Sequence, residues 1–136
     1  MSKINTLQTQ IIAEFNIFDN WTEKYEYLIE LGKSLPLISP EQKIEDNLIR
    51  GCQSRVWLNA KIENGVIIFT ADSDAIITKG IIALLIRVLS HQTPKDIVNA
   101  NLIFIEKIGL NNHLSITRSN GLLSMIKQMK IYALTL

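Results

Sequence analysis

The strongest constraint on the fold is the dipeptide Asn64-Gly65, which lies between two segments of alternating apolar and polar residues. Such alternation predicts half-buried strands, and Asn-Gly favours the two-residue turn that joins antiparallel neighbours. This turn predicts three apolar cross-strand pairs: Ile62 with Ile67, Ala60 with Phe69 and Leu58 with Ala71. The sequence therefore predicts a β-hairpin with one consistently apolar face.

Helical patterns surround this hairpin on both sides. Apolar spacing and stop signals predict helices over residues 4–15, from Trp21 to a stop at Gly32, and over residues 75–90, 93–99, 102–108 and 119–136. Residues 46–49 are expected to add a third antiparallel strand to the hairpin. Helices, a small antiparallel sheet of about three strands and further helices predict an α+β fold. The length suits one domain over residues 1–136.

Local signals predict how several of these helices begin. Asn20 and Glu23 have capping-box spacing ahead of the second helix, and Thr93 precedes a proline at the first position of a short helix. The acidic run over residues 72–74 is expected to cap the helix of residues 75–90. A calcium site there is disfavoured because one acidic turn lacks the alternating ligands of a binding loop.

Charge and hydropathy exclude several classes of partner. Fourteen basic and thirteen acidic residues are scattered along the chain, which disfavours nucleic-acid binding. The most apolar segment, residues 75–89, is interrupted by Lys79 and Arg87, so no membrane span is expected. The N-terminal residues lack the pattern of a signal peptide, which predicts a cytoplasmic protein. A single cysteine also fits a reducing compartment.

Cys52 is the only cysteine, and it lies in a Gly-Cys-Gln-Ser segment before the first predicted strand. One thiol cannot close an internal disulfide or supply a multi-thiolate metal site, so its chemistry must be completed by another molecule. Arg50 and Arg55 are expected to favour the thiolate if they fold back toward the loop, and Gly51 is expected to permit close approach or movement. The alternative is an inert, buried cysteine.

Other candidate residues carry weaker signals. His91 and His113 are the only histidines that could act as a base for a cysteine hydrolase, and neither has a local motif linking it to Cys52. No metal or cofactor is expected, because one cysteine and two distant histidines lack ligand-pair spacing. Lys79-Gly80 lacks the remaining residues of a phosphate loop. Arg118 is left as either a partner contact or an internal salt-bridge residue.

Several segments together resemble the SufE family of sulfur acceptors. They cover nearly the whole chain in order: residues 21–25 (WTEKY), 30–32 (ELG), 51–58 (GCQSRVWL), 72–75 (DSDA), 79–80 (KG), 93–97 (TPKDI) and 118–122 (RSNGL). The resemblance implies the fold shared with IscU-type scaffolds, in which a small antiparallel sheet packs on helices. The chain departs from the family at Ile116 and Thr117, where proline and serine are usual.

The resemblance also implies a function. A desulfurase that uses pyridoxal phosphate removes sulfur from cysteine, and Cys52 would accept that sulfur as a persulfide and pass it to the SufBCD scaffold for iron-sulfur cluster assembly. We name Gly51, Gln53, Ser54 and Arg118 as supporting residues. The protein would then be a carrier and desulfurase activator, and not an enzyme with its own turnover.

Three alternatives stay open at this point. A CsdE-type acceptor shares the cysteine segment and serves a different desulfurase. A cysteine-dependent hydrolase or transferase would need His91 or His113 beside Cys52. A structural adaptor would not need the thiol. A homodimer is also left open.

Overall fold

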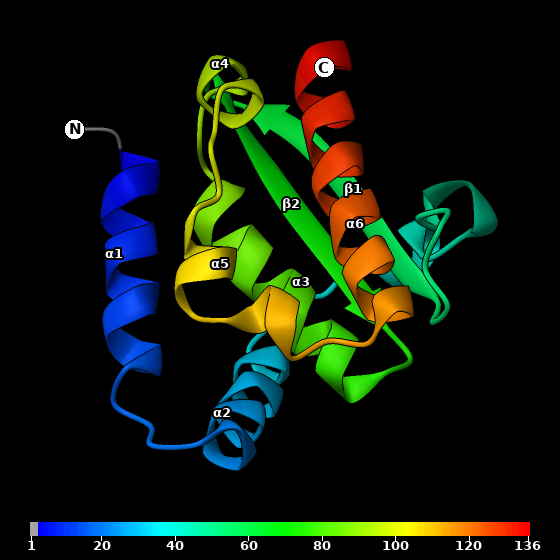
Figure 1. Cartoon of the computed structure of the whole chain (residues 1–136). Helices are drawn as coiled ribbons and strands as arrows, with labels where there is room; N and C mark the ends of the chain where they lie inside the picture. The colour runs from blue at the N-terminus through cyan, green and yellow to red at the C-terminus, as the bar shows by residue number, and fades with distance from the viewer. Residues whose placement is uncertain (1–2) are drawn as a thin grey trace.

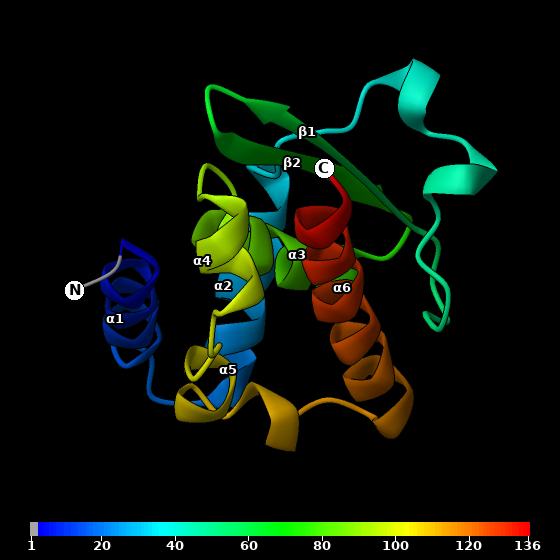
Figure 2. The same cartoon turned by 90° about the horizontal axis from the view of Figure 1, so that it is seen from above.

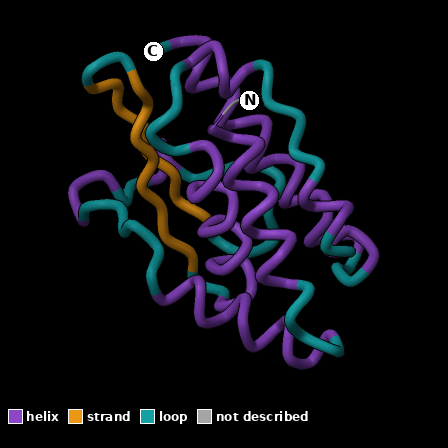
Figure 3. Tube along the Cα trace, turned by 90° about the vertical axis from the view of Figure 1, so that its left-hand side faces the viewer, coloured by secondary structure: helices purple, strands orange, loops and turns teal. Residues whose placement is uncertain are grey.

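The computed structural model describes residues 3–136, which form six α-helices, three short 3-10 helices and one β-hairpin. The elements, in chain order, are α1 (Lys3–Phe15), α2 (Trp21–Lys33), η1 (Pro40–Gln42), η2 (Glu45–Asn47), β1 (Val56–Glu63), β2 (Val66–Ser73), α3 (Ile76–Leu89), α4 (Pro94–Val98), α5 (Phe104–Lys107), η3 (Leu110–Asn112) and α6 (Ile116–Thr135). The hairpin lies on one side of the helical layer that contains α2, α3 and α6 (Figures 1, 2 and 3).

The hairpin has the predicted register. Its cross-strand pairs include Ile62 with Ile67, Ala60 with Phe69 and Leu58 with Ala71. Gly65 adopts a positive φ of 81°, as a tight turn of this kind requires. The α+β prediction is thus confirmed, with a sheet of two strands among the described residues.

The predicted third strand over residues 46–49 is wrong. Only Leu48 forms an isolated bridge with Trp57, and the Ile49 amide donates to the Val56 carbonyl at 2.8 Å. The preceding residues fold into the 3-10 turn η2, where the Asn47 side chain donates to the Gln42 carbonyl at 2.6 Å. This compact turn leaves too few extended residues for a ladder, and the isolated bridge instead closes the base of the loop that carries Cys52.

Helix α3 is the central helix, and α2 packs closely against it. A Cβ atom on Gly80 would lie 2.2 Å from the Leu28 carbonyl oxygen, and one on Gly32 would lie 2.9 Å from the Gly80 nitrogen. Neither glycine could carry a side chain at this separation of the backbones. The prediction that Gly32 stops α2 is therefore wrong, because the helix continues to Lys33 and Gly32 allows the close crossing.

Two predicted helix starts are confirmed and one is wrong. The Asn20 side chain accepts from the Glu23 amide, and the Thr93 hydroxyl accepts from the Asp96 amide. Helix α3 has Ala75 at its N-cap and no side-chain cap. The acidic run over residues 72–74 bonds instead to Lys43, to Arg55 and to the side chain of Lys79 within α3, as described with the site below.

The C-terminal helix α6 closes the other side of α3. It begins at Ile116, three residues before the predicted start, because the Ser115 hydroxyl caps it by accepting from the Arg118 amide. The apolar pattern missed this first turn since Ile116 is 82% exposed. The Tyr132 hydroxyl donates to the Leu58 carbonyl at 3.2 Å and fastens α6 to β1. Helix α5 is shorter than its predicted range of 102–108 and, as predicted, ends before Gly109.

None of the helices within residues 3–136 combines the length and hydropathy needed to cross a bilayer.

Candidate functional site

The candidate site is built on a loop of residues 50–55 that precedes β1. The bond between the Ile49 amide and the Val56 carbonyl closes its base. Gly51 has a φ of +91°, a conformation that favours glycine, and a Cβ there would lie 2.5 Å from Ser124 Oγ on α6. The expected close approach at Gly51 is therefore present, and it brings the loop against α6.

Cys52 follows Gly51 and is partly buried between the loop and α6. Its Sγ atom donates to the Gly121 carbonyl at 3.7 Å, which is a weak bond to sulfur. No other hydrogen bond of residues 50–54 joins this part of the loop to another residue described in the structure. The thiol is thus held by packing and one weak bond, and the loop itself is held loosely between its base and Arg55.

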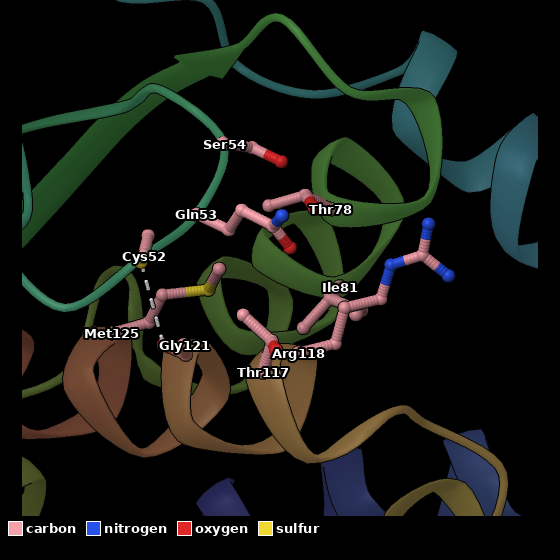
Figure 4. A pocket seen from close by; sticks show the side chains of 9 residues that line it. All are labelled: Cys52, Gln53, Ser54, Thr78, Ile81, Thr117, Arg118, Gly121 and Met125. Atoms are coloured by element: carbon pink, nitrogen blue, oxygen red, sulfur yellow. Dashed lines mark hydrogen bonds between the residues drawn. The ribbon is translucent and has the colours of Figure 1, made fainter.

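A cavity of about 70 Å³ opens beside the thiol. Its lining comes from the loop, from α3 and from the start of α6, as Figure 4 shows: Cys52, Gln53, Ser54, Thr78, Ile81, Thr117, Arg118, Gly121 and Met125. The structure therefore brings the predicted residues Cys52, Gln53, Ser54 and Arg118 together, although the Arg118 guanidinium extends away from Cys52 (Figure 4). Gly51 is the predicted residue that does not line this cavity.

Burial controls the protonation of the thiol. Desolvation raises the pKa of Cys52, and no neighbouring charge contributes to this shift. The expectation that Arg50 and Arg55 favour the thiolate is therefore wrong. Both side chains are exposed, and neither lines the cavity beside the sulfur. In this conformation Cys52 rests as a neutral thiol near pH 7.

The acidic run at the end of β2 positions the loop instead of capping α3. Asp74 Oδ1 accepts from the Arg55 amide at 3.1 Å, and the Ser73 hydroxyl donates to the Arg55 carbonyl at 2.8 Å. Asp72 pairs with Lys43 at 2.9 Å and Lys79 at 3.3 Å. The bonds from Asp74 and Ser73 to Arg55 fix the end of the cysteine loop to the end of the hairpin. Within residues 3–136, no group of three or more acidic, histidine or cysteine side chains is arranged to hold a metal ion.

Both histidines are engaged away from the cavity. The His91 amide donates to the Ile67 carbonyl near the turn of the hairpin, and Cys52 lies before the opposite end, about 20 Å away along the strand. His113 stacks on Trp21 with ring centroids 3.9 Å apart, and its Nδ1 contacts the Gly109 carbonyl. Neither lines the cavity. This geometry gives no support to a Cys-His catalytic pair.

Reasoning from the sequence did not name five residues that line the cavity as part of a site: Thr78, Ile81, Thr117, Gly121 and Met125. Thr78 and Met125 look like ordinary members of helices, and no local motif marks them. Gly121 did carry a signal, because a glycine inside a helical pattern usually has a packing or functional reason. Its reason is the approach of Cys52, whose Sγ would lie 3.5 Å from a Cβ at position 121.

The fold and the loop define a class: a small α+β protein that holds one partly sheltered thiol between a hairpin and a C-terminal helix. The chain belongs to the SufE family, since the family's sequence model, described as "Fe-S metabolism associated domain", matches residues 9–133. An uncharacterized SufE-like protein of Rhizobium etli is 40% identical over 126 residues, which cover 89% of this chain and 85% of that protein.

A likeness at the level of structure supports the fold alone. The solution structure of a hypothetical protein from Thermus thermophilus superposes with a TM-score of 0.79 at 18% identity, covering 95% of this chain and 94% of that one. The family membership links this chain to iron-sulfur metabolism.

Proposed function

We propose that this protein is a sulfur carrier in which Cys52 accepts sulfur as a persulfide from a cysteine desulfurase. The observation that carries the proposal is a solitary thiol, partly sheltered on a loosely held loop beside a small cavity whose lining, among the described residues, includes no histidine or carboxylate. A hydrolase needs a base at the thiol, whereas a carrier needs only a protected sulfur that can meet two partners in turn. Membership of the SufE family supports this choice.

The transfer is a thiol exchange with no net oxidation or reduction. The Cys52 thiolate attacks the terminal sulfur of the desulfurase persulfide, so a sulfur-sulfur bond forms at Cys52 as the bond in the desulfurase breaks. The desulfurase leaves with its own cysteine as a thiolate. The next acceptor, the SufBCD scaffold in this proposal, removes the sulfur by the same step. Because this chain has one cysteine, no internal thiol can discharge the persulfide.

Acceptance requires the loop to move. The sheltered thiol has a raised pKa and faces Gly121, so it must leave α6 to become a reactive thiolate. The bond between Ile49 and Val56 and the bonds that hold Arg55 fasten the base of the loop, so residues 50–54 can turn about this base. Docking of the desulfurase would expose Cys52, and the amide hydrogen exchange of residues 50–54 should change in the complex.

The decisive experiment is mass spectrometry of the intact protein after incubation with a SufS-type desulfurase and cysteine. The wild type should gain sulfur, and Cys52→Ser should gain none. Desulfurase turnover should rise with the wild type and not with the variant. A wild type that gains no sulfur would overturn the proposal, and an equal stimulation by Cys52→Ser would favour a structural adaptor.

The cognate desulfurase is distinguished in the same assay. A CsdA-type enzyme is added in place of the SufS-type enzyme at matched concentration, and the rate of sulfur gain at Cys52 is compared. Faster loading by the CsdA-type enzyme would assign the chain to the CsdE-type branch of the function.

A further inference from the structure

Gly121 has no side chain, and this leaves space beside the Cys52 thiol. The three nearest heavy atoms to a Cβ built there all belong to Cys52, with Sγ at 3.5 Å and Cα at 3.8 Å. An alanine would thus contact a resting thiol at ordinary van der Waals distance. A second sulfur on Cys52 would lie about 2 Å from Sγ, and a methyl group at position 121 would compete with it for the cavity. The missing side chain therefore matters for a persulfide more than for a thiol.

Thr78 on α3 gives an independent sign that the cavity receives a polar group. Its side chain is 5% exposed, lines the cavity and points into it across from Cys52 (Figure 4). Within residues 3–136 its hydroxyl makes no hydrogen bond. No fully buried side-chain nitrogen or oxygen of residues 3–136 lacks a hydrogen-bond partner, so the unbonded Thr78 oxygen is one that the cavity leaves accessible. The Thr78 hydroxyl is therefore free to donate to an occupant of the cavity.

The two helices that wall the cavity place positive potential there. Thr78 lies in the first turn of α3, which has no side-chain cap, and Thr117 lies in the first turn of α6. The first turn of a helix favours anions. A hydropersulfide is a stronger acid than its parent thiol, so the loaded form of Cys52 is the anion that this environment suits, whereas the unloaded thiol stays neutral.

We propose that this cavity holds the terminal sulfur of the Cys52 persulfide. The absence of a side chain at Gly121 provides the space, and the Thr78 hydroxyl acts as the hydrogen-bond donor. The inference rests on the proposed function and names two positioning residues for it. The cavity, of about 70 Å³, has room for one added sulfur, so Thr78 reaches the sulfur directly or through one water.

The first test compares Gly121→Ala with Asn120→Ala, an exposed neighbour on the same helix. Each protein is loaded with a low-molecular-weight alkyl persulfide, so that no desulfurase is involved, and sulfur loss to cyanide is followed as thiocyanate. We expect Gly121→Ala to lose sulfur on the order of tenfold faster than the wild type, because the methyl group overpacks the cavity. Asn120→Ala should match the wild type. Equal rates in all three proteins would overturn the role of Gly121.

The second test compares Thr78→Val, which keeps the shape, with Thr78→Ser, which keeps the hydroxyl. Loss of one hydrogen bond to the anion should make the Thr78→Val persulfide about tenfold more labile, and Thr78→Ser should restore most of the protection. Alkylation of the unloaded thiol should be equal in both variants, which separates this role from a general effect on the loop. Equal lability in Thr78→Val and wild type would overturn the role of Thr78.

The two proposals fail in different ways. If the alkyl persulfide loads and is protected but the desulfurase delivers no sulfur, the cavity inference stands and the carrier function falls. If the desulfurase loads Cys52 but every variant loses sulfur at the same rate, the carrier function stands and the cavity inference falls.

Discussion

Gly80 of α3 and Gly121 of α6 both lie inside helices, but they pack against their neighbours at different distances. A Cβ on Gly80 of α3 would lie 2.2 Å from the carbonyl oxygen of Leu28, whereas a Cβ on Gly121 of α6 would lie 3.5 Å from the Cys52 sulfur. The first contact joins two backbones and has no spare room. The second faces a side chain on a loop and borders a cavity. The same residue type thus makes one interface tight and leaves the other adjustable.

This difference separates the scaffold from the part that must move. The crossing of α2 and α3 buries backbone against backbone, and such contacts resist local opening. The loop over residues 50–54 contributes one weak sulfur bond to its surroundings. Segments with few hydrogen bonds open at low free energy, and reactive loops are drawn from them. A carrier whose thiol must leave shelter requires an arrangement of this kind.

The largest effect on stability should come from adding a side chain at the tight interface between α2 and α3. Gly80→Ala places a methyl group against the Leu28 carbonyl, so α2 and α3 must move apart. We expect the free energy of unfolding to fall by about 2–3 kcal/mol, measured by chemical denaturation. Gly121→Ala is the matched control, because the same change there should raise stability by about 0.5–1 kcal/mol through helix propensity. Equal effects of the two substitutions would remove the distinction between the interfaces.

A smaller effect is expected at Gly51, where the cysteine loop touches α6. Gly51→Ala forces a side chain into a φ of +91° and against Ser124 Oγ, at an expected cost of about 1–3 kcal/mol. Adding Ser124→Ala removes the oxygen but not the backbone strain. The double variant should therefore recover part of the loss, as thermal denaturation can measure. Full recovery would show that the backbone conformation at Gly51 costs nothing, and no recovery would show that Ser124 is not the obstacle.

The hairpin could be predicted because its signals are local. The turn dipeptide and the alternation of apolar residues lie within one short segment, and together they specify the register. The third strand could not be predicted correctly from residues 46–49, because its absence depends on Asn47 bonding to Gln42 in a compact turn. Whether four residues extend or turn is decided by side-chain bonds that their apolar pattern does not encode.

The residues of the candidate site also divide into those that the sequence could predict and those that it could not. Cys52 and its flanking residues form one continuous segment, so their resemblance to a family could be seen in the sequence. Thr78 and Gly121 reach the cavity from helices that are far apart in the chain, and only tertiary packing brings them to the sulfur. Residues close to Cys52 in the sequence also could not predict the environment of its thiol. Two nearby arginines predicted a favoured thiolate, but burial decides the pKa of Cys52 because both side chains turn to solvent.

The smallest predicted effect concerns the pKa of the Cys52 thiol, which lies at the adjustable interface with α6. Burial raises the pKa of Cys52 in the folded protein, so the unfolded chain releases its thiol proton first as the pH rises. The contribution to stability is full below the unfolded pKa and is lost as the pH climbs through the folded pKa. Alkylation by iodoacetamide should thus follow a higher apparent pKa in the folded protein than in guanidinium chloride.

The single cysteine makes this measurement unambiguous, because every alkylated molecule reports on Cys52. The Asn120→Ala protein should give the wild-type profile, and Gly51→Ala should lower the apparent pKa toward that of the unfolded chain, since displacing the loop from Ser124 rehydrates the thiol. An apparent pKa that is equal in folded and unfolded wild type would mean that Cys52 already rests in solvent. The contrast between Gly80 and Gly121 would then describe packing alone and would have no bearing on sulfur transfer.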